Sequence, residues 1–187
     1  MGQHIYVWDL PTRLFHWTLA ASFVVAWITH ESERLMNIHT AAGYLMLGLI
    51  GFRLIWGIIG NRYARFEEFV RGPSAVTRYL TSLIGGRPER HLGHNPAGAI
   101  AIVLLLVLGV GTGVSGWLAL DDFGGDLFEE LHEGFAGVML AVVALHLAGV
   151  VVSSLLHREN LVRSMITGYK GIAPSHEAPV HPGHRPA

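Results

Sequence analysis

Four histidines lie within or beside strongly apolar stretches of the chain, and the spacing of two of them raises a chemical question. His132 and His146 are fourteen residues apart in the segment LHEGFAGVMLAVVALH. On an α-helix this separation is a rise of about 21 Å and nearly four turns, so both imidazoles share one face at two depths. The pattern suggests two groups to bind, one above the other.

The composition is that of a membrane protein with one domain. Hydrophobic residues make up 51% of the 187 residues and charged residues 14%, against roughly 25% charged in soluble domains. The formal net charge of −1 gives no indication of nucleic-acid binding. Because the chain has no cysteine, it excludes thiolate iron–sulfur clusters and covalent attachment of a c-type haem. Any haem must be bound non-covalently.

Four segments are long enough to cross a bilayer, which takes about 20 mostly apolar residues. We therefore expect an all-α membrane protein, a bundle of four transmembrane helices, as a single domain over residues 1–170. Residues 171–187 are rich in proline and histidine, and we expect a disordered tail there. The predicted spans are Leu14–Thr29, Ile38–Ile59, Ala97–Leu118 and Phe135–Leu156.

The connecting segments differ in charge, which predicts the orientation. Residues 61–95 hold six arginines, whereas residues 31–37 hold one and residues 119–131 hold only acidic charges. The positive-inside rule places the arginine-rich segment and both termini in the cytoplasm. Within that segment, GPSAVTRYLTSLI predicts a short amphipathic helix at the membrane surface.

With this topology the four histidines form two pairs at matching depths. His39 lies level with His132 near the outer face, and His16 lies level with His146 near the inner face. Two facing imidazoles are what a six-coordinate haem iron needs as axial ligands. Zinc fits less well, because it needs four ligands converging on one point. Each histidine alone has a simpler interpretation, an imidazole in the headgroup region or bonded to a carbonyl.

Two further residues carry open alternatives. Arg53 follows His39 by fourteen residues, so it would face a haem propionate or a quinone oxygen near the inner level, or else extend to the membrane surface. His94 precedes the third span, with Asn95 as the expected N-cap. His94 would lie at the membrane–water interface, or it would border a quinone pocket at the inner face.

The motifs VWDLPTRLFHW, IHTAAGYLMLGLIGFRLIWG, GHNPAGA and LHEGFAGVMLAVVALH together resemble the bacterial cytochrome b561 family. This family includes the b-type cytochrome subunits of membrane-bound nickel–iron hydrogenases. The resemblance covers roughly residues 4–170. It implies a four-helix membrane domain with two b haems, whose iron ligands correspond to His16, His39, His132 and His146.

The expected function is transmembrane electron transfer through two bis-histidine b haems. The implied partners are membrane lipid, the quinone pool and a periplasmic c-type cytochrome or oxidoreductase, and the sequence leaves a homodimer open. One alternative is an enzyme that oxidises superoxide and reduces quinone, although the acidic outer loops would repel that anion. Another is a membrane scaffold without haem.

Overall fold

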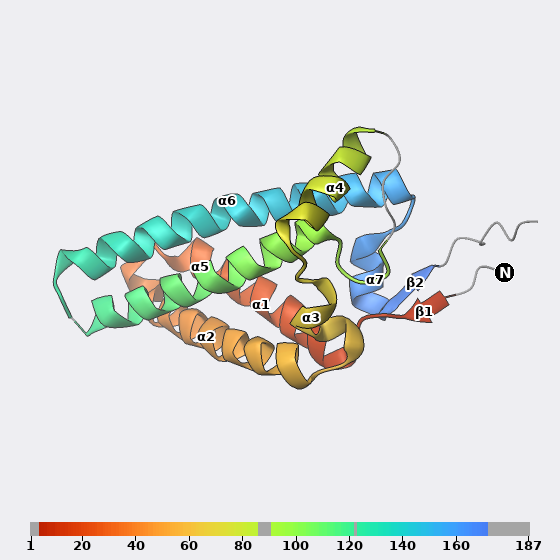
Figure 1. Ribbon diagram of the computed structural model, residues 1–187. Coiled ribbons are helices and arrows are strands. Elements are labelled where there is room, and N and C mark those ends of the chain that lie inside the picture. The colour runs from red at the N-terminus through yellow and green to blue at the C-terminus, as the bar shows by residue number, and fades with distance from the viewer. Residues whose placement is uncertain (1–3, 86–90, 122, 172–187) are drawn as a thin grey trace, which may run out of the picture.

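The computed structural model describes residues 4–85, 91–121 and 123–171, so the predicted tail lies almost wholly outside the described residues. Long helices dominate this part of the chain and lie beside one another, with the short elements gathered mainly at one end (Figure 1). The long helices are α1 (Leu10–Thr29), α2 (Met36–Ile59), α5 (Pro96–Leu120) and α6 (Asp126–His157).

Capping residues fix where two of these helices begin. The Asp9 side chain accepts a hydrogen bond from the backbone N–H of Thr12 at 2.8 Å, and this caps α1. Asn95 likewise accepts from the Gly98 N–H at 2.7 Å, which confirms the N-cap predicted for α5. A proline follows each cap within the first turn, where its missing N–H costs nothing.

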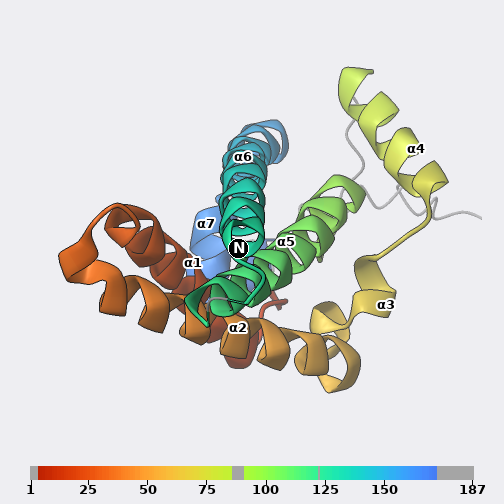
Figure 2. The ribbon, with the colours of Figure 1, turned by 90° about the vertical axis from the view of Figure 1, so that its left-hand side faces the viewer.

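The long helices form two antiparallel hairpins that meet along α2 and α5. Helix α1 packs along α2, and α5 packs along α6, whereas α1 and α6 are not among the closely packed pairs of the described helices. Viewed along the bundle, α1 and α4 (Pro73–Ile84) lie on opposite sides of α5 (Figure 2). Phe15, Ile50 and Leu106, from α1, α2 and α5, form the buried apolar core between the hairpins.

Most short elements lie at the end of the bundle that holds the start of α1. They are η2 (Arg62–Ala64), α3 (Phe66–Phe69), α4, α7 (Leu161–Thr167) and two strands, β1 (His4–Tyr6) and β2 (Tyr169–Gly171). Helix α4 lies where the sequence predicted a short helix. The 3-10 helix η1 (Glu33–Leu35) precedes α2 at the opposite end.

The two ends of the described chain are joined by a small antiparallel sheet. Strands β1 and β2 pair with Ile5 opposite Lys170. Gly168, just before β2, has φ +89°, and its carbonyl accepts from the N–H groups of Val7 and Trp8 at 2.8 and 3.1 Å. A side chain at position 168 would also meet the carbonyl oxygen of Trp8. A glycine is therefore required for this junction.

The helices expose many large apolar side chains, as expected of a surface that faces lipid. Among the described residues, three helices are long and apolar enough to cross a membrane: Glu33–Ile59, Pro96–Leu120 and Asp126–His157. Helix α1 is twenty residues long, but it is not among the three, and it carries polar residues such as Arg13, His16 and Ser22. The structure therefore supports an integral membrane protein with at least these three spanning helices.

Candidate functional site

The structure brings His39 and His132 together near the end of the bundle that holds the α5–α6 turn. Their ring centroids are 5.9 Å apart and the ring planes are nearly perpendicular, at 78°. His39 lies in the first turn of α2. His132 lies within α6, because that helix begins nine residues before the predicted span. Two helices that pack on α5 thus present imidazoles to one another.

We name His39 and His132 the outer pair, and the level of His16 and His146 the inner level, after the predicted orientation. Both rings of the outer pair are held by hydrogen bonds at the same nitrogen. The Nδ1 atom of His39 lies 2.9 Å from the carbonyl oxygen of Ala26, and that of His132 lies 2.8 Å from the carbonyl oxygen of Thr112. A carbonyl can only accept, so each Nδ1 carries a proton and each Nε2 has a lone pair available. This is how proteins orient histidines that bind a metal through Nε2.

Two glycines leave space beside the outer pair. A Cβ atom at Gly116 would lie 2.6 Å from Nδ1 of His132, so only glycine allows the ring its present position. Gly43 lies one helical turn beyond His39 and is half-buried, yet a Cβ there would meet nothing within 4 Å. A flat group can therefore lie against α2 beside His39.

His16 and His146 form a second level nearer the other end of the bundle. They are close enough to interact electrostatically. Among the described residues, no ring contact joins them, so this pair is more open than the outer one. Nδ1 of His16 is buried without a hydrogen-bond partner. A buried nitrogen of this kind normally has a partner, which indicates a group that belongs beside it.

Arg53 is buried at the same level, so its side chain does not extend to the surface. It is only 3% exposed, and its Nη1 atom has no hydrogen-bond partner. The guanidinium carbon lies 4.7 Å from the ring centroid of Phe66, which folds back over α2. Asp9 is the carboxylate that interacts with its charge. An unpaired guanidinium nitrogen in this position can bind an anionic oxygen.

His94 lies between two aromatic rings just before α5. Its ring centroid is 4.5 Å from that of Trp8 and 4.6 Å from that of Phe69, and its Nδ1 has no partner. Burial, together with the nearby charges of Arg53 and Lys170, lowers the pKa of His94 to about 3. The imidazole is therefore neutral at physiological pH.

A pocket of about 410 Å³ adjoins this level, between α5 and α6. His146 and His94 line it, whereas His16 does not. The walls also include small residues, Ala97, Gly98 and Gly149, which leave room between the two helices. The pocket can hold an organic molecule beside the inner histidine level.

Sequence reasoning missed Asp9, whose side chain connects the start of α1 to the end of α2. Besides capping α1, its carboxylate accepts from Nε1 of Trp56 at 3.1 Å and from Nδ2 of Asn61 at 2.9 Å. The side chain is 5% exposed. The order Asp-Leu-Pro could have revealed the cap, but no sequence signal places Trp56 and Asn61 beside it.

A membrane helical bundle in which His39 faces His132, with two further histidines at a second level, fits the architecture of a membrane cytochrome. The family described as prokaryotic cytochrome b561 matches residues 7–168. The chain belongs to this family, and it is a b-type cytochrome of membrane electron transport.

The names of curated relatives agree with this family, although their sequences differ greatly from that of this chain. The chain is 25% identical to a probable Ni/Fe-hydrogenase B-type cytochrome subunit of Azotobacter vinelandii, over 89% of this chain and 88% of the relative. It is 23% identical to the protein of the same name from Cupriavidus necator, over 88% and 86%. It is 27% identical to a probable Ni/Fe-hydrogenase 1 B-type cytochrome subunit of Escherichia coli K12, over 52% of each chain. No solved structure gives a significant match.

The family implies haem b, and the residues described above fit this group. The outer pair offers two Nε2 lone pairs and space beside α2. The inner level offers two further imidazoles with a buried guanidinium nitrogen that lacks a partner. Haem b supplies reversible one-electron exchange at iron when it is bound.

Proposed function

We propose that this chain is a diheme cytochrome that carries electrons across the bacterial inner membrane, between a redox partner outside and the quinone pool. The observation that supports this most strongly is the facing pair of His39 and His132, with both Nδ1 atoms bonded to carbonyl oxygens. Imidazoles on both sides of an iron leave no site for a substrate, which favours electron transfer.

The outer haem would be held between His39 and His132. The carbonyls of Ala26 and Thr112 would keep the rings in the ligating tautomer and resist their rotation. Because Gly116 has no side chain, His132 reaches its position from α6 across the face of α5. These contacts hold the ligands in place before the haem binds, which reduces reorganisation during electron transfer.

The inner haem would be held between His16 and His146. Arg53 supports this assignment, because its buried nitrogen without a partner would find an acceptor in a propionate oxygen. The positive charge of Arg53 would also favour the reduced, more negative state of the haem. Helices α1 and α6 are not closely packed against each other in the described chain, so their side chains can approach a group between them.

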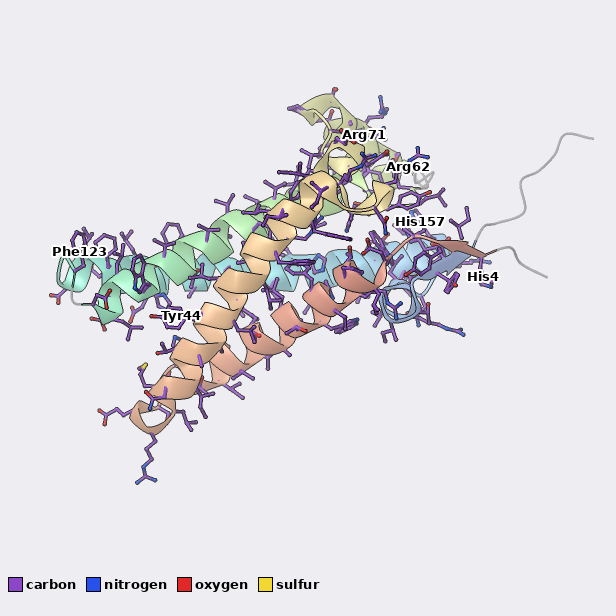
Figure 3. The ribbon with its side chains drawn as sticks, turned by 90° about the horizontal axis from the view of Figure 1, so that it is seen from below. His4, Tyr44, Arg62, Arg71, Phe123 and His157 are labelled. Carbon is purple, nitrogen blue, oxygen red and sulfur yellow. The ribbon has the colours of Figure 1, made fainter. Side chains whose placement is uncertain are left out.

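We propose that the end of the bundle with α4, α7 and the two strands lies in the cytoplasm, with helix α1 as a fourth span. Figure 3 shows Arg62, Arg71 and His157 at this end and Phe123 at the opposite end. Arginines gather at the first end, whereas Asp121 and Asp126 flank the α5–α6 turn. The positive-inside rule supports this orientation.

The pocket beside His146 suits a quinone. It is mainly apolar, has polar groups at its end, and adjoins the inner histidine level. The imidazole of His94 and the ring of Trp8 offer a hydrogen-bonding group and a flat surface for a quinone ring.

The outer partner would be a periplasmic oxidoreductase or a c-type cytochrome. Relatives named as cytochrome subunits of Ni/Fe-hydrogenases support a redox enzyme as this partner. The exposed acidic turn between α5 and α6 would complement a basic surface on it.

Purification of the protein and quantification of extracted haem test this proposal. We expect about two b haems per chain, released by acidic acetone because no cysteine can form a thioether. Reduction by a small reagent followed by addition of a soluble quinone should reoxidise both. A ratio near one haem per chain, or no haem at all, would contradict the two-level arrangement.

A further inference from the structure

The pocket between α5 and α6 has an apolar side and a polar end. Its apolar walls include Leu104, Leu145 and Leu156, which are 45%, 71% and 44% exposed. On membrane helices such exposure is to lipid, so a lipid-soluble molecule can enter from the bilayer. The polar end lies where α4, the segment before α5 and strand β2 meet.

Tyr79 is the most completely buried large side chain among the described residues, at 2% exposure. It lies on α4, most of whose other described residues are half-buried or exposed. Its hydroxyl bonds to the side chains of Ser153 on α6 and Asn95 at the start of α5, and all three residues line the pocket. A cytoplasmic surface helix thus places one phenol at the end of a membrane pocket.

A second titratable side chain, that of His91, lies beside this phenol. The ring of His91 lies edge-on to the ring of Tyr79, with centroids 5.6 Å apart, and His91 is only partly buried. The Nζ of Lys170 donates to the backbone carbonyls of His91 and Gly93 at 3.2 and 3.5 Å, which holds this segment against β2. The other titratable groups around the pocket are His94, His146 and His157.

We propose that Tyr79 is the proton donor to a quinone bound in this pocket. The inference rests on the proposed function, because it requires that the chain reduces quinone. Two electrons and two protons convert a quinone into a quinol. For each proton, the O–H bond of Tyr79 breaks and an O–H bond forms at a quinone oxygen, while one electron arrives from a ferrous haem that becomes ferric. His91 then returns a proton from cytoplasmic water to Tyr79.

The surroundings of Tyr79 suit this role in two ways. Burial raises the pKa of the phenol, so it carries its proton at rest. The hydrogen bonds from Ser153 and Asn95 act in the opposite direction and stabilise the anion formed after transfer. Proton transfer requires a donor that keeps its proton until a stronger base, here the quinone oxygen after it has gained an electron, lies beside it.

The test uses the haem-loaded protein in lipid nanodiscs and compares it with Tyr79→Phe and Tyr44→Phe. Tyr44 lies on α2, is 49% exposed and is far from the pocket, so it is a matched control. Each protein is reduced and mixed with decylubiquinone, and haem oxidation is followed in H₂O and D₂O. Ferricyanide serves as an acceptor that takes no proton. Binding of decylubiquinone is measured separately through quenching of tryptophan fluorescence, since Trp8 lines the pocket.

We expect Tyr79→Phe to slow oxidation by the quinone at least tenfold and to change the solvent isotope effect. Its quinone affinity should stay within about threefold of the parent, and its oxidation by ferricyanide should be unchanged, because neither needs the proton. Tyr44→Phe should behave as the parent. Ser153→Ala retains the phenol and should give a smaller slowing in the same direction.

Three results would overturn the inference, and they can be told apart. If the parent reduces decylubiquinone and Tyr79→Phe matches it, Tyr79 is not the donor, although the proposed function stands. If Tyr79→Phe weakens quinone affinity by the same factor by which it lowers the oxidation rate, Tyr79 only helps to bind the quinone. If the parent itself fails to reduce the quinone, the proposed function fails with the inference. Should Tyr79→Phe not fold, Ser153→Ala decides by the same criteria.

Discussion

The Nδ1 atom of His132 lies 2.8 Å from the carbonyl oxygen of Thr112, and this contact exists because Gly116 follows Thr112 by one turn of α5 without a side chain. The backbone of α5 therefore orients an imidazole that belongs to α6. His39 is oriented in the same way by the carbonyl of Ala26 in α1. Each ring of the outer pair is thus held by a helix other than its own.

Gly116→Ala should disturb the outer haem alone. The added Cβ would lie 2.6 Å from Nδ1 of His132, so the ring must move away. Gly48→Ala is the matched control, because a Cβ there meets nothing within 4 Å. Visible spectra of the reduced proteins should show one component lost or shifted in Gly116→Ala and none in Gly48→Ala. An unchanged spectrum in Gly116→Ala would show that His132 does not need this position.

Arg53→Gln should lower the midpoint potential of the inner haem. A positive charge about 10 Å away at an effective dielectric constant of about 20 contributes on the order of tens of millivolts in favour of the reduced state. The outer haem should keep its potential. A redox titration followed in the visible spectrum measures both. Arg53→Lys keeps the charge and should shift the potential less. Equal shifts at both haems would argue against a position of Arg53 beside the inner one.

Asp9→Ala should destabilise the whole bundle. The change removes the cap of α1 and leaves the buried donors of Trp56 and Asn61 without an acceptor. We expect a loss of about 2–3 kcal/mol, which appears as a lower temperature of haem release and denaturation. Glu31→Ala removes an exposed carboxylate and should have little effect. Similar melting of the two variants would show that the Asp9 contacts contribute little.

Neutralising Asp121, Asp126 and Glu130 together should slow electron entry from a basic periplasmic donor by several-fold at low salt. These carboxylates are exposed at the α5–α6 turn and in the first two turns of α6, and they would steer a positive partner. The difference should shrink as salt rises, because exposed charges are screened over about 8–10 Å at 0.10–0.15 M. Reduction by a small neutral reagent should be unaffected. If the triple variant and the parent react equally fast at low salt, the turn does not dock the donor.

The sequence predicts the long helices well, because apolar runs of membrane length have few other stable structures. The start of α6 is less predictable from the sequence. Asp126, Glu129 and Glu130 lie outside the apolar run, yet they continue the helix, since acidic residues in the first turns suit its positive end. Asn95 followed by Pro96 identifies the start of α5, because the asparagine side chain caps the helix and the proline fits its first turn.

Contacts between distant segments could not be predicted from sequence. Phe66 and Phe69 fold back over Arg53, and the sequence left open whether that arginine is buried. Tyr79 looked like one residue of a surface helix, and its bonds to Ser153 and Asn95 depend on how α4 lies against α5 and α6. Strands β1 and β2 have three residues each, too few for an alternating pattern to appear.

The pairing of histidines by depth is the central claim, and spectra of four single variants test it most directly. His39→Ala and His132→Ala should each remove the same spectral component and lower the haem content from about two to about one per chain. His16→Ala and His146→Ala should each remove the other component. If His39→Ala and His132→Ala instead removed different components, or if neither lost haem, the two-level arrangement would be wrong.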